Sequence, residues 1–81
     1  MARLLDRRVP VRAAPDGTPL WFVFRGRRRV VRVLDTWREI GEWWDGQGER
    51  IVYRVETEGG GVFELDYRPR DGGWFLYKAY D

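Results

Sequence analysis

The sequence predicts a mainly β protein built from one small antiparallel sheet of five or six strands. Runs of β-branched and aromatic residues alternate with Gly-rich or charged turns, and helical spacing is hard to find in any window of 11 residues. The chain has 81 residues, which suffices for one domain over residues 1–81 but not for an ordinary two-sheet sandwich. We therefore expect a strongly twisted or barrel-like sheet.

Six segments carry the strand pattern, and the turns between them have a chemical basis. Pro15-Asp16-Gly17 supplies a fixed φ, a side-chain acceptor and a residue that tolerates positive φ, and Gly59–Gly61 permits a tight reversal. Residues 1–18 are predicted to be an N-terminal extension or an edge strand. The predicted strands are Val9–Ala13, Leu20–Arg25, Arg28–Asp35 (with an extension toward Ile40 as an alternative), Arg50–Thr57, Gly61–Arg68 and Gly73–Tyr80.

The last three predicted strands alternate apolar and charged residues, which indicates a sheet with one face in solvent. Tyr53 and Leu65 belong to the apolar set. The charged set includes Arg54 and Lys78, which an antiparallel arrangement places across from Glu64 and Asp66. We expect these opposite charges to form exposed cross-strand pairs.

Two structures compete for residues 36–41. Thr36-Trp37-Arg38-Glu39 matches the capping box that begins a helix, and predicts one short helical turn. Gly41 follows too soon for a longer helix. The alternative is a long, bulged strand that runs into the loop at residues 45–48.

The residue types that are missing exclude most catalytic chemistry. The chain contains no Cys, His, Ser or Asn, so disulfides, thiolate or imidazole metal sites and Ser/His or Cys/His nucleophiles are excluded. Carboxylate pairs such as Glu64 and Asp66 have the spacing of an exposed strand face, where a carboxyl group keeps its ordinary pKa. We expect no catalytic residues, no metal, no cofactor and no enzymatic activity.

Composition also bears on location and host. The longest apolar runs, such as Leu20–Phe24, are far shorter than the ~20 residues of a membrane span, and the N-terminus has no signal-like core. We therefore expect a soluble cytoplasmic protein. Fourteen of the 15 basic residues are Arg, which suggests a GC-rich genome, and the scarcity of Asn, Gln, Cys and Met is typical of a thermophile.

Positive charge is concentrated in the N-terminal half. Residues 1–35 contain nine Arg and three Asp, a net charge of +6, whereas residues 36–81 carry −4. Guanidinium groups beside an aromatic face are the elements of single-stranded DNA or RNA binding. The competing explanation is a solvated turn that protects a sheet edge. The candidate nucleic-acid-binding residues around this predicted hairpin are Trp21, Arg25, Arg27, Arg28, Arg29 and Arg32.

Trp43 and Trp44 are the second candidate site. Adjacent residues of an extended chain point to opposite sides, so both indoles are buried only if both faces are covered. One exposed Trp would be a candidate anchor for a protein partner. The alternative is that both fill a small core.

The order of aromatic and glycine residues carries a family resemblance. Gly41-Glu42-Trp43-Trp44, Tyr53-Arg54-Val55, Phe63-Glu64-Leu65, Gly73-Trp74-Phe75-Leu76 and Tyr80-Asp81 resemble the C-terminal region of ImuB, an inactive Y-family polymerase homologue of the bacterial mutasome. A family of short bacterial domains of unknown function shares the pattern. The resemblance covers residues 19–81 and implies a non-enzymatic adaptor in DNA repair or translesion synthesis, with a polymerase-like protein as partner. We expect a monomer, or a homodimer formed by edge strands.

Overall fold

A computed structural model describes residues 2–40 and 48–80, and this part of the chain forms seven strands. It contains no helix with the length and apolarity that crossing a lipid bilayer requires. The strands are β1 (Ala2–Arg8), β2 (Val11–Ala13), β3 (Pro19–Val23), β4 (Arg27–Ile40), β5 (Glu49–Thr57), β6 (Val62–Arg68) and β7 (Gly73–Tyr80).

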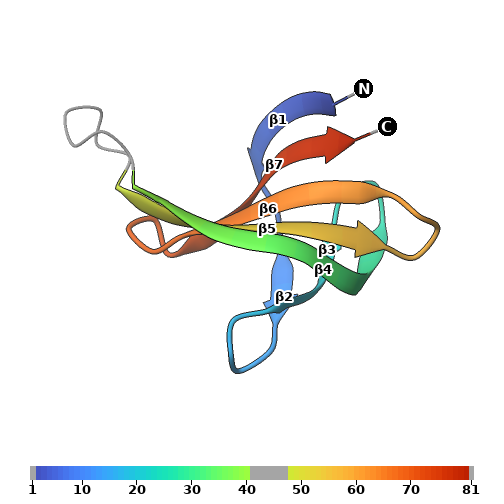
Figure 1. Cartoon of the computed structure of the whole chain (residues 1–81), viewed down its shortest axis with the longest axis horizontal. Coiled ribbons are helices and arrows are strands. Elements are labelled where there is room, and N and C mark those ends of the chain that lie inside the picture. The colour runs from blue at the N-terminus through green and yellow to red at the C-terminus, as the bar shows by residue number, and fades with distance from the viewer. Residues whose placement is uncertain (1, 41–47, 81) are drawn as a thin grey trace.

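The seven strands form one antiparallel sheet that curls into a half-barrel (Figure 1). Its order is β1-β7-β6-β5-β4-β3-β2, so the N-terminal segment supplies both edge strands. The long strand β4 pairs with β3 through Arg27–Arg29 and with β5 from Val30 to Ile40. Its register with β5 shifts twice, near Val30 and near Val33. Such bulges bend a strand and increase its twist, which accounts for the curl of the sheet around β4.

A two-residue link, Val9–Pro10, connects the two edges of the sheet. The Val9 amide donates a hydrogen bond to the Trp74 carbonyl of β7 at 3.2 Å, and the Val23 amide of β3 donates to the Pro10 carbonyl at 3.1 Å. Val9 is also buried in the core. The link therefore holds β3 near β7 and keeps the half-barrel closed on that side.

The core lies inside the curl, between β3 and the inner face of β5, β6 and β7. The Phe22 and Phe24 rings meet the Phe63 ring edge-on, with centroids 5.3 and 6.4 Å apart. Leu65 and Leu76, paired across β6 and β7, are fully buried. The apolar residues expected on one face of the last three strands therefore do form the core, as the alternation predicts.

The structure corrects two predictions about the elements. Five or six strands were expected, and the described residues form seven, because Ala2–Arg8 makes a separate edge strand beside β7. Over residues 36–40 the helical turn is wrong and the alternative of a long, bulged strand is confirmed, because these residues continue strand β4. There Trp37 pairs with Val52 and Glu39 with Arg50, so pairing with β5 overrides the local capping pattern.

Candidate nucleic-acid interface

The Arg-rich segment folds as the hairpin between β3 and β4. The chain reverses at Arg25 and Gly26, whose φ angles are 53° and 96°. Glycine adopts such a φ without steric cost, and here it allows the Phe24 amide to donate to the Gly26 carbonyl at 2.9 Å. The reversal sets Arg29 opposite Trp21 on the neighbouring strand.

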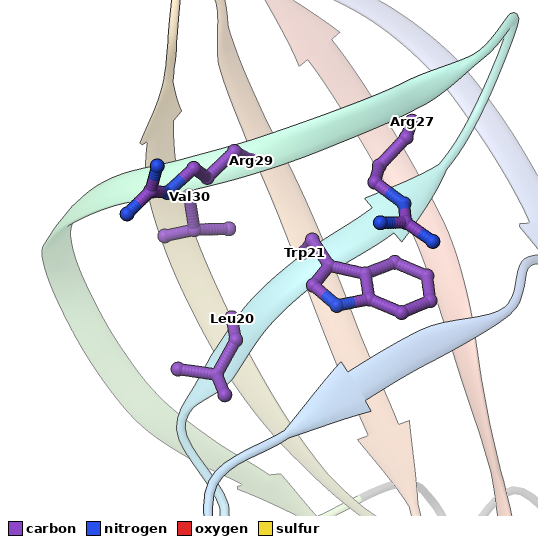
Figure 2. A pocket seen from close by; sticks show the side chains of 5 residues that line it. All are labelled: Leu20, Trp21, Arg27, Arg29 and Val30. Atoms are coloured by element: carbon purple, nitrogen blue, oxygen red, sulfur yellow. The ribbon is translucent and has the colours of Figure 1, made fainter.

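Strand register gathers basic side chains around Trp21. Arg12 of β2 and Arg29 of β4 both pair with Trp21 of β3, so the three side chains lie on the same face of the sheet. The Arg27 guanidinium lies over the indole, 4.2 Å from the ring (Figure 2). An open pocket of about 420 Å³ adjoins these groups. We call the following residues the Trp21 surface: Arg12, Leu20, Trp21, Arg27, Arg29 and Val30.

Few acidic groups neutralise the Trp21 surface. Within residues 2–40 and 48–80, Arg12 and Arg27 form no ion pair with a carboxylate. Arg29 lies 3.8 Å from Glu58, but both side chains are well exposed and such pairs are weak. The surface therefore presents guanidinium donors and one indole to solvent.

The structure divides the predicted Arg set between different environments. Arg28 is partly buried, where its Nε donates to the Phe24 carbonyl at 2.7 Å and its guanidinium packs on the Phe24 and Phe63 rings. Arg32 forms a 2.6 Å ion pair with Glu56. Arg25 is exposed at the tip of the hairpin. Of the predicted residues, Trp21, Arg27 and Arg29 come together, whereas Arg28 holds the turn.

Sequence reasoning missed Arg12, which completes the row across β2, β3 and β4. Only the pairing register places it beside Trp21, and a register shift between Arg12 and Ala13 hides that register from residue spacing. Trp43 and Trp44 lie outside the described residues.

The charged face of the last three strands, which the sequence pattern places in solvent, is instead largely covered by side chains. Glu64 is 4% exposed and Asp66 is fully buried. The covering side chains are long: Arg50 packs on the Tyr77 ring at 4.4 Å and Arg68 on the Phe75 ring at 3.8 Å. A register shift between Glu64 and Leu65 on β6 adds one residue to β7, so both Tyr77 and Lys78 reach this face.

The buried carboxylates of this face are held by arginines. Asp66 accepts hydrogen bonds from Arg68 at 2.9 Å and Arg50 at 3.2 Å, both through one oxygen, while its Oδ1 has no partner within the described structure. Burial raises the pKa of Asp66, and the two guanidinium groups oppose that shift. Glu64 pairs with Arg54 at 3.1 Å, as the sequence predicted.

Glu64 has a second partner at the end of β7. The Tyr80 hydroxyl donates a hydrogen bond to the Glu64 carboxylate, and this bond raises the pKa of the hydroxyl. Because Glu64 and Asp66 are both engaged by guanidinium groups, the face works as an ion-pair network that covers one side of the sheet.

Comparison with known proteins places the chain in a family. The model of a domain of unknown function, DUF6504, matches residues 3–81, which is nearly the whole chain. No curated protein and no solved structure matches the chain. The comparisons show no link to ImuB, so that resemblance stays a prediction. On the strength of the match over residues 3–81, the chain belongs to the DUF6504 family of domains of unknown function.

Proposed function

We propose that the domain is a non-enzymatic binding module that takes up single-stranded DNA or RNA on the Trp21 surface. The observation that carries the proposal is the row of Arg12, Trp21 and Arg29 across three strands, with Arg27 over the indole. Guanidinium forks bind phosphates bidentately, and an indole stacks on bases of any sequence. A partly exposed Trp between basic groups fits both parts of a nucleotide.

The pocket beside Trp21 supports a single strand over a duplex. Its apolar members Leu20 and Val30 line the same pocket as Trp21, so an unpaired base can leave water on the same surface whose arginines contact the backbone (Figure 2). Base stacking of this kind contributes about 1 to 3 kcal/mol per base, and a duplex keeps its bases stacked on each other instead.

The proposal is tested by fluorescence anisotropy with labelled dT20, rU20 and a duplex of equal length, each at two salt concentrations. We expect micromolar binding of the single strands at low salt. The double variant Arg12→Gln/Arg27→Gln should weaken binding by at least about tenfold and reduce the salt slope by roughly 1.4, which corresponds to two lost phosphate contacts.

A matched control separates a site from general positive charge. The double variant Arg3→Gln/Arg38→Gln removes the same charge from strands β1 and β4 away from Trp21. These two charges act on a ligand at the Trp21 surface only over a long, salt-screened distance. Their removal should therefore weaken binding by less than about twofold. Equal losses in the two double variants, or no binding at low salt, would refute the proposal.

An adaptor role in DNA repair or translesion synthesis is the second candidate. It follows from the ImuB resemblance, and the apolar residues exposed along β4 offer a surface for it: Val31, Leu34 and Ile40. Ile40 is 81% exposed, which is unusual for a large apolar side chain. Co-purification with a polymerase-like protein that is lost on Ile40→Asp, with oligonucleotide binding unchanged, would favour this role.

A further inference from the structure

A second pocket is lined by residues of the β2–β3 turn and of strands β5, β6 and β7, and it shares no residue with the Trp21 surface. It has a volume of about 360 Å³, within the range of small-ligand sites. Three rings from β5, β6 and β7 form one wall, with Trp74 at 5.6 Å from Tyr53 and 5.3 Å from Tyr67 between centroids. The end of β2 adds Ala13 to the lining, and the turn between β2 and β3 adds Asp16 and Gly17.

The rings of this pocket differ from most other rings in lacking a cation. Guanidinium or ammonium groups lie over the faces of seven aromatic residues in the described structure: Trp21, Phe24, Trp37, Phe63, Phe75, Tyr77 and Tyr80. Across residues 2–40 and 48–80, no Arg or Lys occupies the faces of Tyr53, Tyr67 or Trp74. The chain has 15 basic residues, and within the described structure these three partly buried rings carry no cation, whereas seven of the other eight rings do.

The β2–β3 turn contributes one negative charge to the pocket. Asp16 is exposed, and its Oδ1 accepts a hydrogen bond from the Thr18 amide at 3.0 Å, which fixes the carboxylate at the pocket. That backbone hydrogen bond also lowers the pKa of Asp16, so the group is ionised at neutral pH. The other members, Ala13, Gly17 and Ile51, are apolar or have no charged side chain.

Aromatic faces with a single carboxylate select a large, weakly hydrated cation. The ring quadrupole attracts positive charge. Methyl groups on the nitrogen pack against an apolar wall, whereas a strongly hydrated ion would stay in water. From this combination we propose that the Tyr53–Tyr67–Trp74 pocket binds a quaternary ammonium group, with Asp16 as its counter-charge. Free choline-like solutes and trimethylated lysine side chains share this chemistry.

The test compares a cation with its uncharged copy. Choline and 3,3-dimethylbutan-1-ol have the same shape, and only choline is charged. Titration into the ¹⁵N-labelled full chain should shift the Trp74 indole and Gly17 amide signals with millimolar affinity for choline. The neutral alcohol should bind at least about fivefold more weakly. A parallel titration with trimethyllysine methylamide distinguishes a free choline-like solute from a methylated lysine side chain. The cation that binds more tightly indicates which of the two the pocket prefers.

Two variants and one control assign the effect to the pocket. Asp16→Asn keeps an oxygen that accepts the Thr18 amide, so the turn is retained, and should weaken choline binding about three- to fivefold. Tyr67→Leu should weaken it about three- to tenfold. Asp35→Asn is the matched control, because Asp35 is an exposed carboxylate that likewise accepts a neighbouring amide, from Thr36 at 2.9 Å, outside the pocket.

The outcomes separate clearly. Tighter binding of choline than of the alcohol, weakened by Asp16→Asn and not by Asp35→Asn, supports the proposal. Equal binding of choline and the alcohol would show an apolar pocket without cation selectivity and overturn it, as would no shift with either cation. If Tyr67→Leu fails to fold, the ligand pair and the two Asp variants still decide.

Discussion

Replacing Asp66 with leucine removes the carboxylate that Arg50 and Arg68 share under the covered face of the sheet. Losing one partner of a buried ion pair costs about 3 to 5 kcal/mol. Here each arginine keeps a second carboxylate at 2.6 Å, Arg50 from Glu39 and Arg68 from Asp6. We therefore expect the lower end, a loss of about 3 kcal/mol in the free energy of unfolding.

That loss is large for this chain. A domain of 81 residues has a free energy of unfolding of about 4 to 12 kcal/mol. At about 4 to 8 °C per kcal/mol, the Asp66→Leu variant should melt roughly 12 to 24 °C below the parent chain. Asp66→Asn keeps one acceptor for the two arginines and loses only the charge, so its loss should be nearer ~1 to 2 kcal/mol.

Urea denaturation followed by circular dichroism measures the free energy of unfolding of both variants. Glu58→Gln serves as the control variant. Glu58 forms an exposed ion pair with Arg29 at 3.8 Å, so this control should change stability by less than about 0.5 kcal/mol. A midpoint for Asp66→Leu equal to or above that of the parent chain would refute the reasoning. It would mean that relieving the desolvation that raises the pKa of Asp66 outweighs the cost of leaving Arg50 and Arg68 with one carboxylate each.

Three further variants test other parts of the structure. Leu65→Ala, at a fully buried core position, should lower the free energy of unfolding by about 2 to 5 kcal/mol in chemical denaturation, and a loss below 1 would contradict the assigned core. Gly26→Ala places a side chain at a φ of 96° in the β3–β4 turn and should cost about 1 kcal/mol or more, seen as a lower melting temperature. Glu39 has a pKa lowered by hydrogen bonds from the Trp37 indole and from Arg50, so it stabilises the fold above its unfolded-state pKa and loses that effect as pH falls through its folded-state pKa. Glu39→Gln should accordingly reduce the stability lost on acidification, and an unchanged slope of melting temperature against pH below 4.5 would exclude this role.

The C-terminal half of the fold was predictable because local and long-range signals agree there. The strand expected at Arg50–Thr57 runs from Glu49 to Thr57, and the one at Gly73–Tyr80 has the expected bounds. In this half the apolar alternation matches the core face, and Gly or Pro marks each turn.

The first strand was less predictable because it has little buried surface. In β1 only Leu5 packs against the core, and its other side chains are exposed, so no alternation marks Ala2–Arg8 as a strand. Thr36–Glu39 shows the opposite case, where a helical capping pattern lies in a strand because pairing with β5 decides its structure. Short local patterns are weak when a sheet offers long-range partners.

The candidate sites follow the same rule. Trp21, Arg27 and Arg29 were predictable from local charge and their place around one hairpin, whereas Arg12 joins them only through strand register. The pocket of Tyr53, Tyr67 and Trp74 combines three strands with a distant turn, which no spacing in the sequence reveals. The burial of Asp66 likewise depends on side chains from other strands that cover it.

The pairing of β1 with β7 has a consequence for the order in which the strands can form the sheet. Strand β1 is synthesised before the other six described strands, but its neighbour in the described sheet is β7, the seventh of them. Contacts between such distant segments form slowly, because a long loop must close before they gain any stabilisation. During translation β1 therefore cannot take its place in the sheet until β7 has left the ribosome.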